Sequence, residues 1–337
     1  MTPLHAGARV AVRTCLNIGP DDRVFILTDE PTLAIGQALA DEAAATGAAV
    51  ALERLESYGE RPLRRLPPAL VAAYRDVNPT AGFFAAAALP GEITFRIELG
   101  DFIRGLGTVR HGHMPGIIPL LMTDGMLTDY NRVYALTMRV YELARRSRRL
   151  RVTNPKGTDL TATFRPDRRW VPSHGRYHHP GDWGNLPEGE TFTCPDRVDG
   201  VVVADVLGDY FSEKYGLLAH PVRFIIAESR VQEVSCADAA LAAEVWDYLR
   251  SAENGDRVGE LAIGTNIGLT RLVGNLLQDE KFPGLHLAFG NPYPQRTGAD
   301  WTSSIHVDVI PTVCTIELDG RRLLTDGVYE PDILADL

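Results

Sequence analysis

Residue types that bind metal ions cluster in the last quarter of the chain. The cluster comprises Glu260 in Gly-Glu-Leu-Ala-Ile-Gly-Thr-Asn, His286 in Leu-His-Leu-Ala-Phe-Gly, and His306 with Asp308 in Ile-His-Val-Asp-Val-Ile. Successive side chains of a β-strand point to opposite faces, so we expect His306 and Asp308 on one face and their apolar neighbours on the other. A buried strand rarely carries such a polar face without partners, and the pattern therefore points to a metal site.

The mixture of carboxylates and imidazoles indicates which metals this site would bind. Carboxylate oxygens and imidazole nitrogens suit zinc, cobalt or manganese, and no thiolate lies near enough in sequence to suggest a structural cysteine-zinc site. Several carboxylates can hold two ions about 3.5–4 Å apart, with one carboxylate bridging them, and such a pair lowers the pKa of a shared water toward neutrality. The cluster thus indicates hydrolysis by a metal-activated water.

Length and charge restrict the classes of partner. A chain of 337 residues with 45% hydrophobic residues is expected to form two domains. The net charge of −10 argues against a nucleic-acid or anionic-membrane partner, because these need a basic face. A small peptide or other small-molecule substrate is expected instead. The basic run from Arg145 to Arg151 is interpreted as the end of a helix, where backbone carbonyls attract cations.

The cysteines and the N-terminus indicate a cytoplasmic protein. The four cysteines are widely separated and form neither a Cys-x-x-Cys motif nor a disulfide framework; they are Cys15, Cys194, Cys236 and Cys314. The N-terminus lacks a basic segment followed by a long apolar one, and no apolar run approaches the length of a membrane span. We therefore expect a soluble protein that is not exported.

Residues 1–150 are predicted to form an α/β domain with a mostly parallel sheet. Residues 23–28 read as a buried strand, residues 32–46 as a helix and residues 48–52 as the next strand, which is a βαβ unit. The same alternation continues with helical stretches at 68–75 and 130–149 and an apolar run at 82–89. The turn after the first strand, residues 28–32, is acidic and has no glycine-rich stretch, so no nucleotide cofactor is expected.

Residues 151–337 are predicted to form a β-rich α+β domain that contains the metal site. Short strand-like runs alternate there with turns rich in proline, glycine and asparagine. One helical insert, residues 238–250, is expected on the surface of this domain.

Five ordered segments of the C-terminal half resemble the M29 family of metalloaminopeptidases, of the aminopeptidase T and S type. The segments are residues 185–195 (Asn-Leu-Pro-Glu-Gly-Glu-Thr-Phe-Thr-Cys-Pro), Gly259-Glu260, Asp279-Glu280-Lys281, residues 286–293 (His-Leu-Ala-Phe-Gly-Asn-Pro-Tyr) and His306-Val-Asp308. Weaker similarity continues through residues 152–161 and into the N-terminal domain, so the resemblance covers nearly the whole chain.

The resemblance implies a dinuclear site and assigns a role to each residue. It implies that Glu190 serves one metal, that Glu260 bridges two, and that His286, His306 and Asp308 complete the two coordination shells. It further implies a homodimer and cleavage of the first residue from a peptide.

Two further residues receive roles beside the metals. Tyr293 would ligate a metal or donate a hydrogen bond to the oxyanion, and Glu280 would orient His286 from outside the coordination shell. The chain is shorter than the best-known members, and Pro292 and Pro294 bracket Tyr293. These differences fall near the substrate-facing loops.

Other interpretations of these residues remain open. Glu190 could be a solvated turn residue, Glu260 a carboxylate at a strand edge or helix start, His286 a hydrogen-bonded core histidine and Tyr293 an anchored core side chain. The family also resembles ring-opening dioxygenases of dihydroxypyridines, which use one Fe(II) held by two histidines and one carboxylate. Those enzymes carry histidine at the place of Glu260. A third reading is a metal-binding protein without catalysis.

Further histidines and aromatic residues lie outside the predicted ligand set. The histidines are His111, His113, His174, His178 and His179, for which a substrate contact or dimer contact is at least as plausible as metal binding. Trp183 and Asn185 precede Glu190 in a loop rich in proline and glycine, where they would line the pocket or shape the turn.

Overall fold

The computed structural model describes residues 3–208 and 210–337, which form two compact units. Unit 1 comprises the chain up to Asn131 together with Gly175–Glu188, and unit 2 comprises Arg132–His174 and Gly189–Leu337. The sequence instead places a single boundary between residues 150 and 151. The difference has two causes. Leu136, Val140 and Ala144 pack into the core of unit 2. The short strand β8 (Trp183–Asn185) pairs with β4 (Arg110–Pro115) and so returns to the sheet of unit 1.

Unit 1 is built on a five-stranded parallel sheet. The strand order is β2 (Ala49–Arg54), β1 (Arg23–Thr28), β3 (Ala81–Ala86), β4, β8. The central strands β1 and β3 are nearly continuous apolar runs, as expected for parallel strands covered on both faces. The α/β class predicted for this part of the chain is confirmed.

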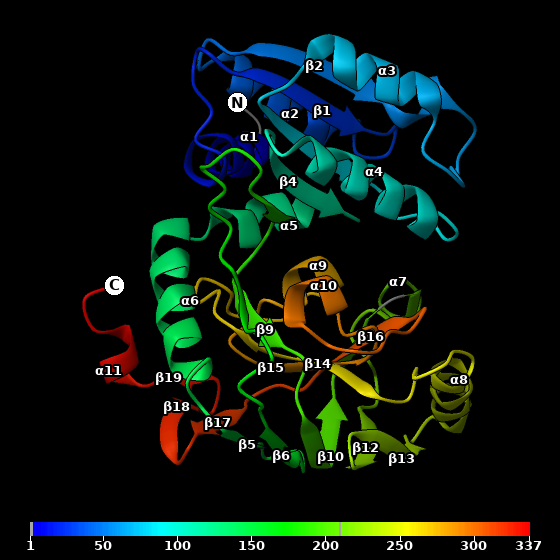
Figure 1. Cartoon of the computed structure of the whole chain (residues 1–337), viewed down its shortest axis with the longest axis vertical. Coiled ribbons are helices and arrows are strands. Elements are labelled where there is room, and N and C mark those ends of the chain that lie inside the picture. Colours follow the sequence, from blue (N-terminus) through cyan, green and yellow to red (C-terminus); the bar gives the residue numbers. More distant parts are fainter. Residues whose placement is uncertain (1–2, 209) are drawn as a thin grey trace. The chain divides into compact units, whose positions relative to one another are not determined.

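Helices cover both faces of this sheet (Figure 1). The helices of unit 1 are α1 (Pro3–Arg9), α2 (Leu33–Ala44), α3 (Pro68–Val77), α4 (Ile93–Leu106) and α5 (Pro119–Thr123), with one π-helical turn, η1 (Val10–Cys15), and the 3-10 turns η2 (Leu55–Tyr58) and η3 (Gly125–Leu127). Phe25 and Leu27 of β1 face α3 and α4 in one apolar cluster. Thr28, on the opposite face, contacts Gly36 of α2.

The acidic turn after β1 is neutralised from within unit 1. Asp29 is fully buried, and its Oδ2 accepts hydrogen bonds from Arg61 at 2.7 Å and from the backbone N–H of Ala87 at 2.8 Å. Arg61 also donates to Oε2 of Glu92 at 2.6 Å. An ion-paired network thus occupies the carboxyl ends of β1 and β3.

Unit 2 contains two antiparallel sheets. The larger has the strand order β13 (Arg230–Ser235), β12 (Val222–Ala227), β10 (Arg197–Ala204), β6 (Asp159–Thr163), β5 (Arg149–Thr153), β17 (Thr315–Leu318), β18 (Arg321–Thr325), β19 (Val328–Tyr329). The smaller has the order β11 (Val206–Leu207), β16 (His306–Ile310), β15 (Gly284–Gly290), β14 (Val258–Gly264), β9 (Glu190–Thr193), β7 (Val171–Ser173). This confirms the predicted β-rich class.

The core of unit 2 lies between the two sheets. Leu150 and Val152 of the larger sheet belong to the same buried cluster as Leu261 and Leu287 of the smaller one. The helices of this unit are α6 (Tyr130–Ala144), α7 (Tyr210–Tyr215), α8 (Ala239–Arg250), α9 (Leu276–Asp279), α10 (Pro294–Thr297) and α11 (Pro331–Leu334). The smaller sheet buries one face in the core, which leaves its other face to carry polar side chains.

Two predicted helices of unit 2 have different outcomes. The insert at residues 238–250 is α8, and the side chain of Asp238 caps it by accepting hydrogen bonds from the N–H groups of Ala240 and Leu241. The helix predicted at residues 130–149 ends at Ala144, so the basic run does not close it as expected. Arg149 and Arg151 instead lie on β5, where they alternate with the buried Leu150 and Val152.

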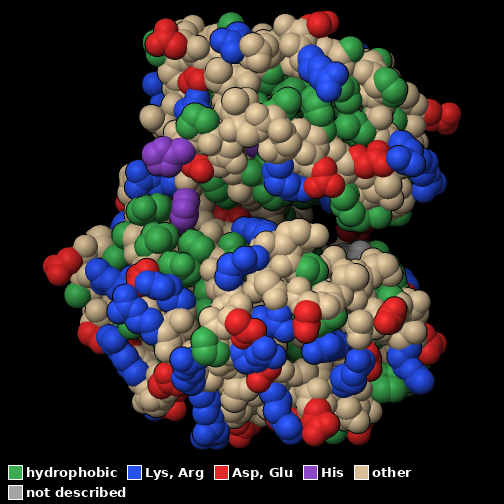
Figure 2. Space-filling view, in the orientation of Figure 1, with side chains coloured by type: hydrophobic (Ala, Val, Ile, Leu, Met, Phe, Trp, Pro, Cys, Tyr) green, Lys and Arg blue, Asp and Glu red, His purple; other side chains and the backbone are tan. Residues whose placement is uncertain are grey.

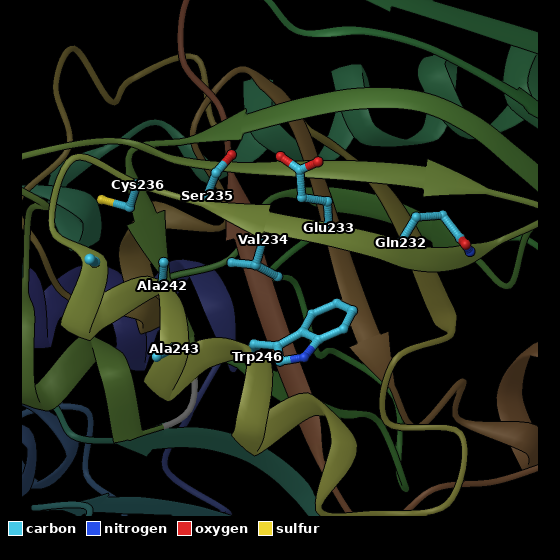
Figure 3. A pocket seen from close by; sticks show the side chains of 9 residues that line it. Gln232, Glu233, Val234, Ser235, Cys236, Ala242, Ala243 and Trp246 are labelled. Carbon is cyan, nitrogen blue, oxygen red and sulfur yellow. The ribbon is translucent and has the colours of Figure 1, made fainter.

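The surface of unit 2 carries mixed charge and an open pocket beside α8. Figure 2 shows basic and acidic side chains close together on the face it presents, in keeping with exposed ion pairs such as Arg321–Asp332. The pocket in Figure 3 lies between β13 and α8, with Val234 and Trp246 between strand and helix; it contains no predicted metal ligand. Within the described residues, no helix is both long and apolar enough to cross a membrane.

Candidate metal centre

Four adjacent strands of the smaller sheet in unit 2 bring the predicted ligands together. Glu190 lies on β9, Glu260 on β14, His286 on β15, and His306 and Asp308 on β16. The antiparallel register sets Glu190 opposite Gly264, His286 opposite Ala262, Asp308 opposite Ala288, and His306 opposite Gly290. Each of these ligands is therefore paired with a glycine or alanine, so its partner in the neighbouring strand has no bulky side chain.

The opposite face of the same strands explains why the ligands point where they do. Leu261, Leu287 and Val309 alternate with the ligands along β14, β15 and β16 and are fully buried in the core of unit 2. Since side chains alternate along a strand, burial of these residues forces Glu260, His286 and Asp308 onto the other face. The hydrophobic core thus determines the direction of the polar side chains.

The polar atoms on this face lie close enough to share ions. Nε2 of His286 is 3.4 Å from Oε1 of Glu260, 3.5 Å from Oε2 of Glu190 and 3.9 Å from Oδ1 of Asp308. Nε2 of His306 is 3.8 Å from Oε2 of Glu260 and 3.6 Å from Oδ1 of Asp308. All five predicted ligands therefore belong to one cluster.

Unsatisfied polar atoms show that this cluster suits a cation. Oε2 of Glu190, Oε2 of Glu260 and Oδ1 of Asp308 are buried and have no hydrogen-bond partner. A buried carboxylate oxygen without a partner is costly, and a divalent ion would satisfy several at once. Among the described residues, two overlapping groups have ligand atoms within 4.8 Å of one another. One group is Glu190, Glu260 and His286, and the other is Glu280, His286 and Asp308.

The carboxylates also change the proton affinity of both histidines. Burial disfavours the charged ring of His286, but the hydrogen bond that its Nε2–H donates to Glu260 and the charges of Glu190 and Asp308 outweigh it and raise its pKa to about 9. Burial likewise opposes protonation of His306, yet the nearby negative charges of Asp308 and Glu260 raise its pKa to about 10. Without metal, both rings therefore carry the positive charge that balances the carboxylates.

The loop after β15 orients His306 and carries Tyr293. Nδ1 of His306 is 2.9 Å from the carbonyl oxygen of Asn291, so Nδ1–H donates and Nε2 is free to face the carboxylates. The ring of Tyr293 lies 4.8 Å from that of His306, and Tyr293 is 39% exposed. Its φ of 50° is unusual for a non-glycine residue. Tyr293 is thus held beside the cluster and reaches solvent.

Glu280 and Lys281 enter the cluster from the turn after α9. Glu280, which the sequence predicts to orient His286, lies in a group with His286 and Asp308 whose geometry could hold a metal ion. Sequence reasoning assigned no role to Lys281, which is 1% exposed and lies 2.8 Å from Oε1 of Glu190 and 2.9 Å from Oε1 of Glu280. Its position directly after Asp279-Glu280 was the only signal available.

The histidines outside the predicted ligand set have different surroundings. His111 and His113 lie on β4 of unit 1, and both rings pack against Trp183 of β8, with centroid distances of 6.1 and 5.0 Å. Burial, with a smaller effect of the Arg104 charge, lowers the pKa of His111 to about 3. These histidines are neutral members of an aromatic cluster. Asn185 also lies on β8.

His174 and His178 each contact a residue of their own unit. The ring of His174 meets that of Tyr134 edge-on at 4.8 Å, and Nε2 of His178 lies 2.8 Å from the carbonyl oxygen of Thr14. The backbone N–H of His179 donates to Asp182 at 2.8 Å. None of these five histidines belongs to a potential metal-binding group among the described residues.

Comparison with known proteins identifies the family. Residues 133–319, more than half of the chain, match the thermophilic metalloproteases of family M29. The chain belongs to this family of metal-dependent peptidases. A comparison with curated protein sequences finds no match.

Two solved structures share the fold over nearly the whole chain. The 2,5-dihydroxypyridine dioxygenase from Pseudomonas putida KT2440 superimposes with a TM-score of 0.72 at 16% identity, covering 98% of each chain. Wild-type AmpT from Thermus thermophilus superimposes with a TM-score of 0.67 at 20% identity, covering 97% of this chain and 98% of that one. At these identities the likeness establishes the fold.

Proposed function

We propose that this protein is an aminopeptidase that removes N-terminal residues from small peptides at a dinuclear metal centre. The orientation of Glu260 carries the proposal. Its Oε1 lies 3.4 Å from Nε2 of His286, and its Oε2 lies 3.8 Å from Nε2 of His306. One carboxylate thus faces two separate imidazoles. This is the arrangement that a carboxylate bridging two ions requires, and two ions suit hydrolysis by a shared water.

The residues around the cluster have complementary tasks. Bound divalent ions would polarise the peptide carbonyl and lower the pKa of a water molecule. Glu190 and His286 would hold one ion, His306 and Asp308 the other, and Glu260 would join them. The hydroxyl of Tyr293 would donate a hydrogen bond to the oxyanion that forms on the attacked carbonyl.

A comparison of free and blocked peptides tests this proposal. Metal-free protein would be loaded with zinc, cobalt or manganese and assayed on a series of dipeptides and aminoacyl-4-nitroanilides, with the N-acetylated forms as controls. Hydrolysis that requires a free amino group and about two metal equivalents per chain is the expected result. Equal cleavage of blocked and free substrates would exclude an aminopeptidase.

One observation supports a second candidate, a mononuclear Fe(II) dioxygenase that opens a hydroxylated pyridine ring. Oδ1 of Asp308 lies 3.9 Å from His286 and 3.6 Å from His306, which is a possible arrangement of two histidines and one carboxylate. In that reading Glu190 and Glu260 would be buried without a role. Oxygen consumption with a dihydroxypyridine, dependent on one equivalent of iron and indifferent to Glu260→Gln, would favour the dioxygenase.

A further inference from the structure

Lys281 is an unusual residue for this chain. Only three of the 34 basic residues are lysines, and the other two, Lys156 and Lys214, make ion pairs at the surface. Lys281 is 1% exposed and is among the largest fully buried side chains of the described residues. Burying an ammonium group is costly unless charged partners surround it, so its contacts must account for its position.

Two carboxylates of the candidate metal centre are among these contacts. Nζ lies 2.8 Å from Oε1 of Glu190 and 2.9 Å from Oε1 of Glu280. The second oxygen of Glu190, Oε2, has no hydrogen-bond partner and lies 3.5 Å from Nε2 of His286. One carboxylate oxygen of Glu190 therefore faces the lysine, and the other faces the ligand cluster.

Backbone hydrogen bonds fix the two segments that carry Glu190 and Lys281. The N–H of Thr265 donates to the carbonyl of Gly189, and the N–H of Asn266 donates to the carbonyl of Lys281. These bonds connect the residue before Glu190 to the end of β14 and then to Lys281 itself. The lysine and the glutamate are thus positioned by one continuous set of hydrogen bonds within unit 2.

Gly264 allows the turn that carries Lys281 to lie close to strand β14. It lies opposite Glu190 in the sheet, and a Cβ atom at this position would be 1.9 Å from the carbonyl oxygen of Phe282. Any other residue would push the turn that carries Lys281 away from the sheet. A compact ammonium with three donors fits between two carboxylates in such a space, whereas a planar guanidinium needs more room.

We propose that Lys281 is a positioning residue of the metal centre, which binds Oε1 of Glu190 and thereby restricts this glutamate to a single metal bond through Oε2. The same ammonium holds Glu280 at the edge of the ligand cluster. The inference rests on the proposed role of Glu190 as a metal ligand. It adds a determinant of metal affinity that is itself neither a ligand nor a group touching substrate.

Zinc binding by Lys281→Met tests the proposal. Methionine keeps the length and volume of the side chain but removes the charge and the donors. Lys214→Met is the matched control, since Lys214 pairs with Glu244 outside the centre. Zinc dissociation constants would be measured by chelator competition on metal-free wild type and both variants, together with urea unfolding of each protein with and without zinc.

We expect Lys281→Met to weaken zinc binding by roughly 10- to 100-fold, as for other groups that orient a ligand from outside the coordination shell, and Lys214→Met to leave it unchanged. Unchanged or tighter zinc binding in Lys281→Met would overturn the proposal. So would an equal loss of stability with and without zinc, because that is what a purely structural lysine predicts. Wild type that binds none of zinc, cobalt and manganese would instead refute the proposed function.

A crystal structure of zinc-loaded wild type keeps the proposal testable even if Lys281→Met does not fold. The expected arrangement is Oε1 of Glu190 on Nζ of Lys281 and Oε2 on zinc. A glutamate bound to zinc through both oxygens, with Lys281 displaced, would contradict it.

Discussion

Glu260 contacts His286 diagonally across the pair of strands β14 and β15. The register places Glu260 opposite Ala288 and His286 opposite Ala262, yet Oε1 of the glutamate reaches Nε2 of the histidine at 3.4 Å. The second oxygen of Glu260 has no hydrogen bond and lies 3.8 Å from Nε2 of His306. The proposed two-metal centre therefore depends most on Glu260.

Glu260→Gln should therefore lose metal and activity together. We expect the metal content to fall from about two equivalents to one or fewer, and kcat to fall by more than the roughly 10- to 100-fold typical of groups outside the coordination shell. Glu317→Gln on β17 makes the same chemical change away from the cluster and is the control. Elemental analysis of both purified variants provides the measurement, and a Glu260→Gln protein with full metal content would contradict the bridging role.

Tyr293→Phe should affect the chemical step more than substrate binding. If the hydroxyl stabilises the oxyanion, kcat should fall by about 10²- to 10³-fold with little change in KM. Tyr58→Phe, which removes a hydroxyl that donates to Glu53 in unit 1, is the matched control. Steady-state kinetics on an aminoacyl-4-nitroanilide separates the two parameters. A change confined to KM would show that Tyr293 acts in binding instead.

Gly264→Ala should damage both stability and metal binding. The added Cβ would meet the backbone oxygen of Phe282, which cannot move as a side-chain end could. Overpacking of this kind costs about 1–3 kcal/mol or more in the free energy of unfolding. Gly105→Ala in α4, where no atom lies within 4 Å of the added Cβ, should be neutral or stabilising. Urea unfolding measures both, and an unaffected Gly264→Ala protein would refute the close approach.

Removal of metal should destabilise unit 2 selectively. A ligand present at about 1,000 times its dissociation constant stabilises the folded state by about 4 kcal/mol, and that stabilisation is lost on chelation. We expect faster amide hydrogen exchange in β14, β15 and β16 after treatment with a chelator, whereas β1 and β3 should be unchanged. Equal changes in both units would argue against a metal site confined to unit 2. Hydrogen-exchange mass spectrometry distinguishes the two outcomes.

Acid should destabilise unit 1 through its buried histidines. The folded pKa of His111 is about 3, below the value of 6.5 for an exposed ring, so the unfolded chain binds more protons below pH 6.5. The stability of unit 1 is therefore complete above pH 6.5 and falls as the pH drops toward 3, by about 1.4 kcal/mol per pH unit for this group. Burial also lowers the pKa of His113, which adds to the effect.

Hydrogen exchange pulsed along a urea titration at pH 7.5 and pH 5.5, followed on β4, measures this loss. His111→Phe should weaken the pH dependence because it removes one titrating group while keeping a ring beside Trp183. An identical pH dependence in the variant and the wild type would show that other groups are responsible.

Some elements were predictable because their signals are local. The strand at residues 23–28 and the helix that Asp238 caps depend on neighbours in the sequence, and the structure has both. The helix predicted to end at Arg149 was too long because the arginine run conceals a strand. Leu150 and Val152 alternate with arginines there, and pairing of β5 with β6 and β17 decides between the two conformations.

By itself, the sequence determined the residue types of the candidate centre and the strand face on which His306 and Asp308 lie, because side-chain alternation is a property of the local backbone. Only the tertiary structure decided that Glu190 lies opposite Gly264 and that Lys281 is buried against it. Strand register and burial depend on pairing between segments distant in the chain, and no local pattern encodes which strands become neighbours.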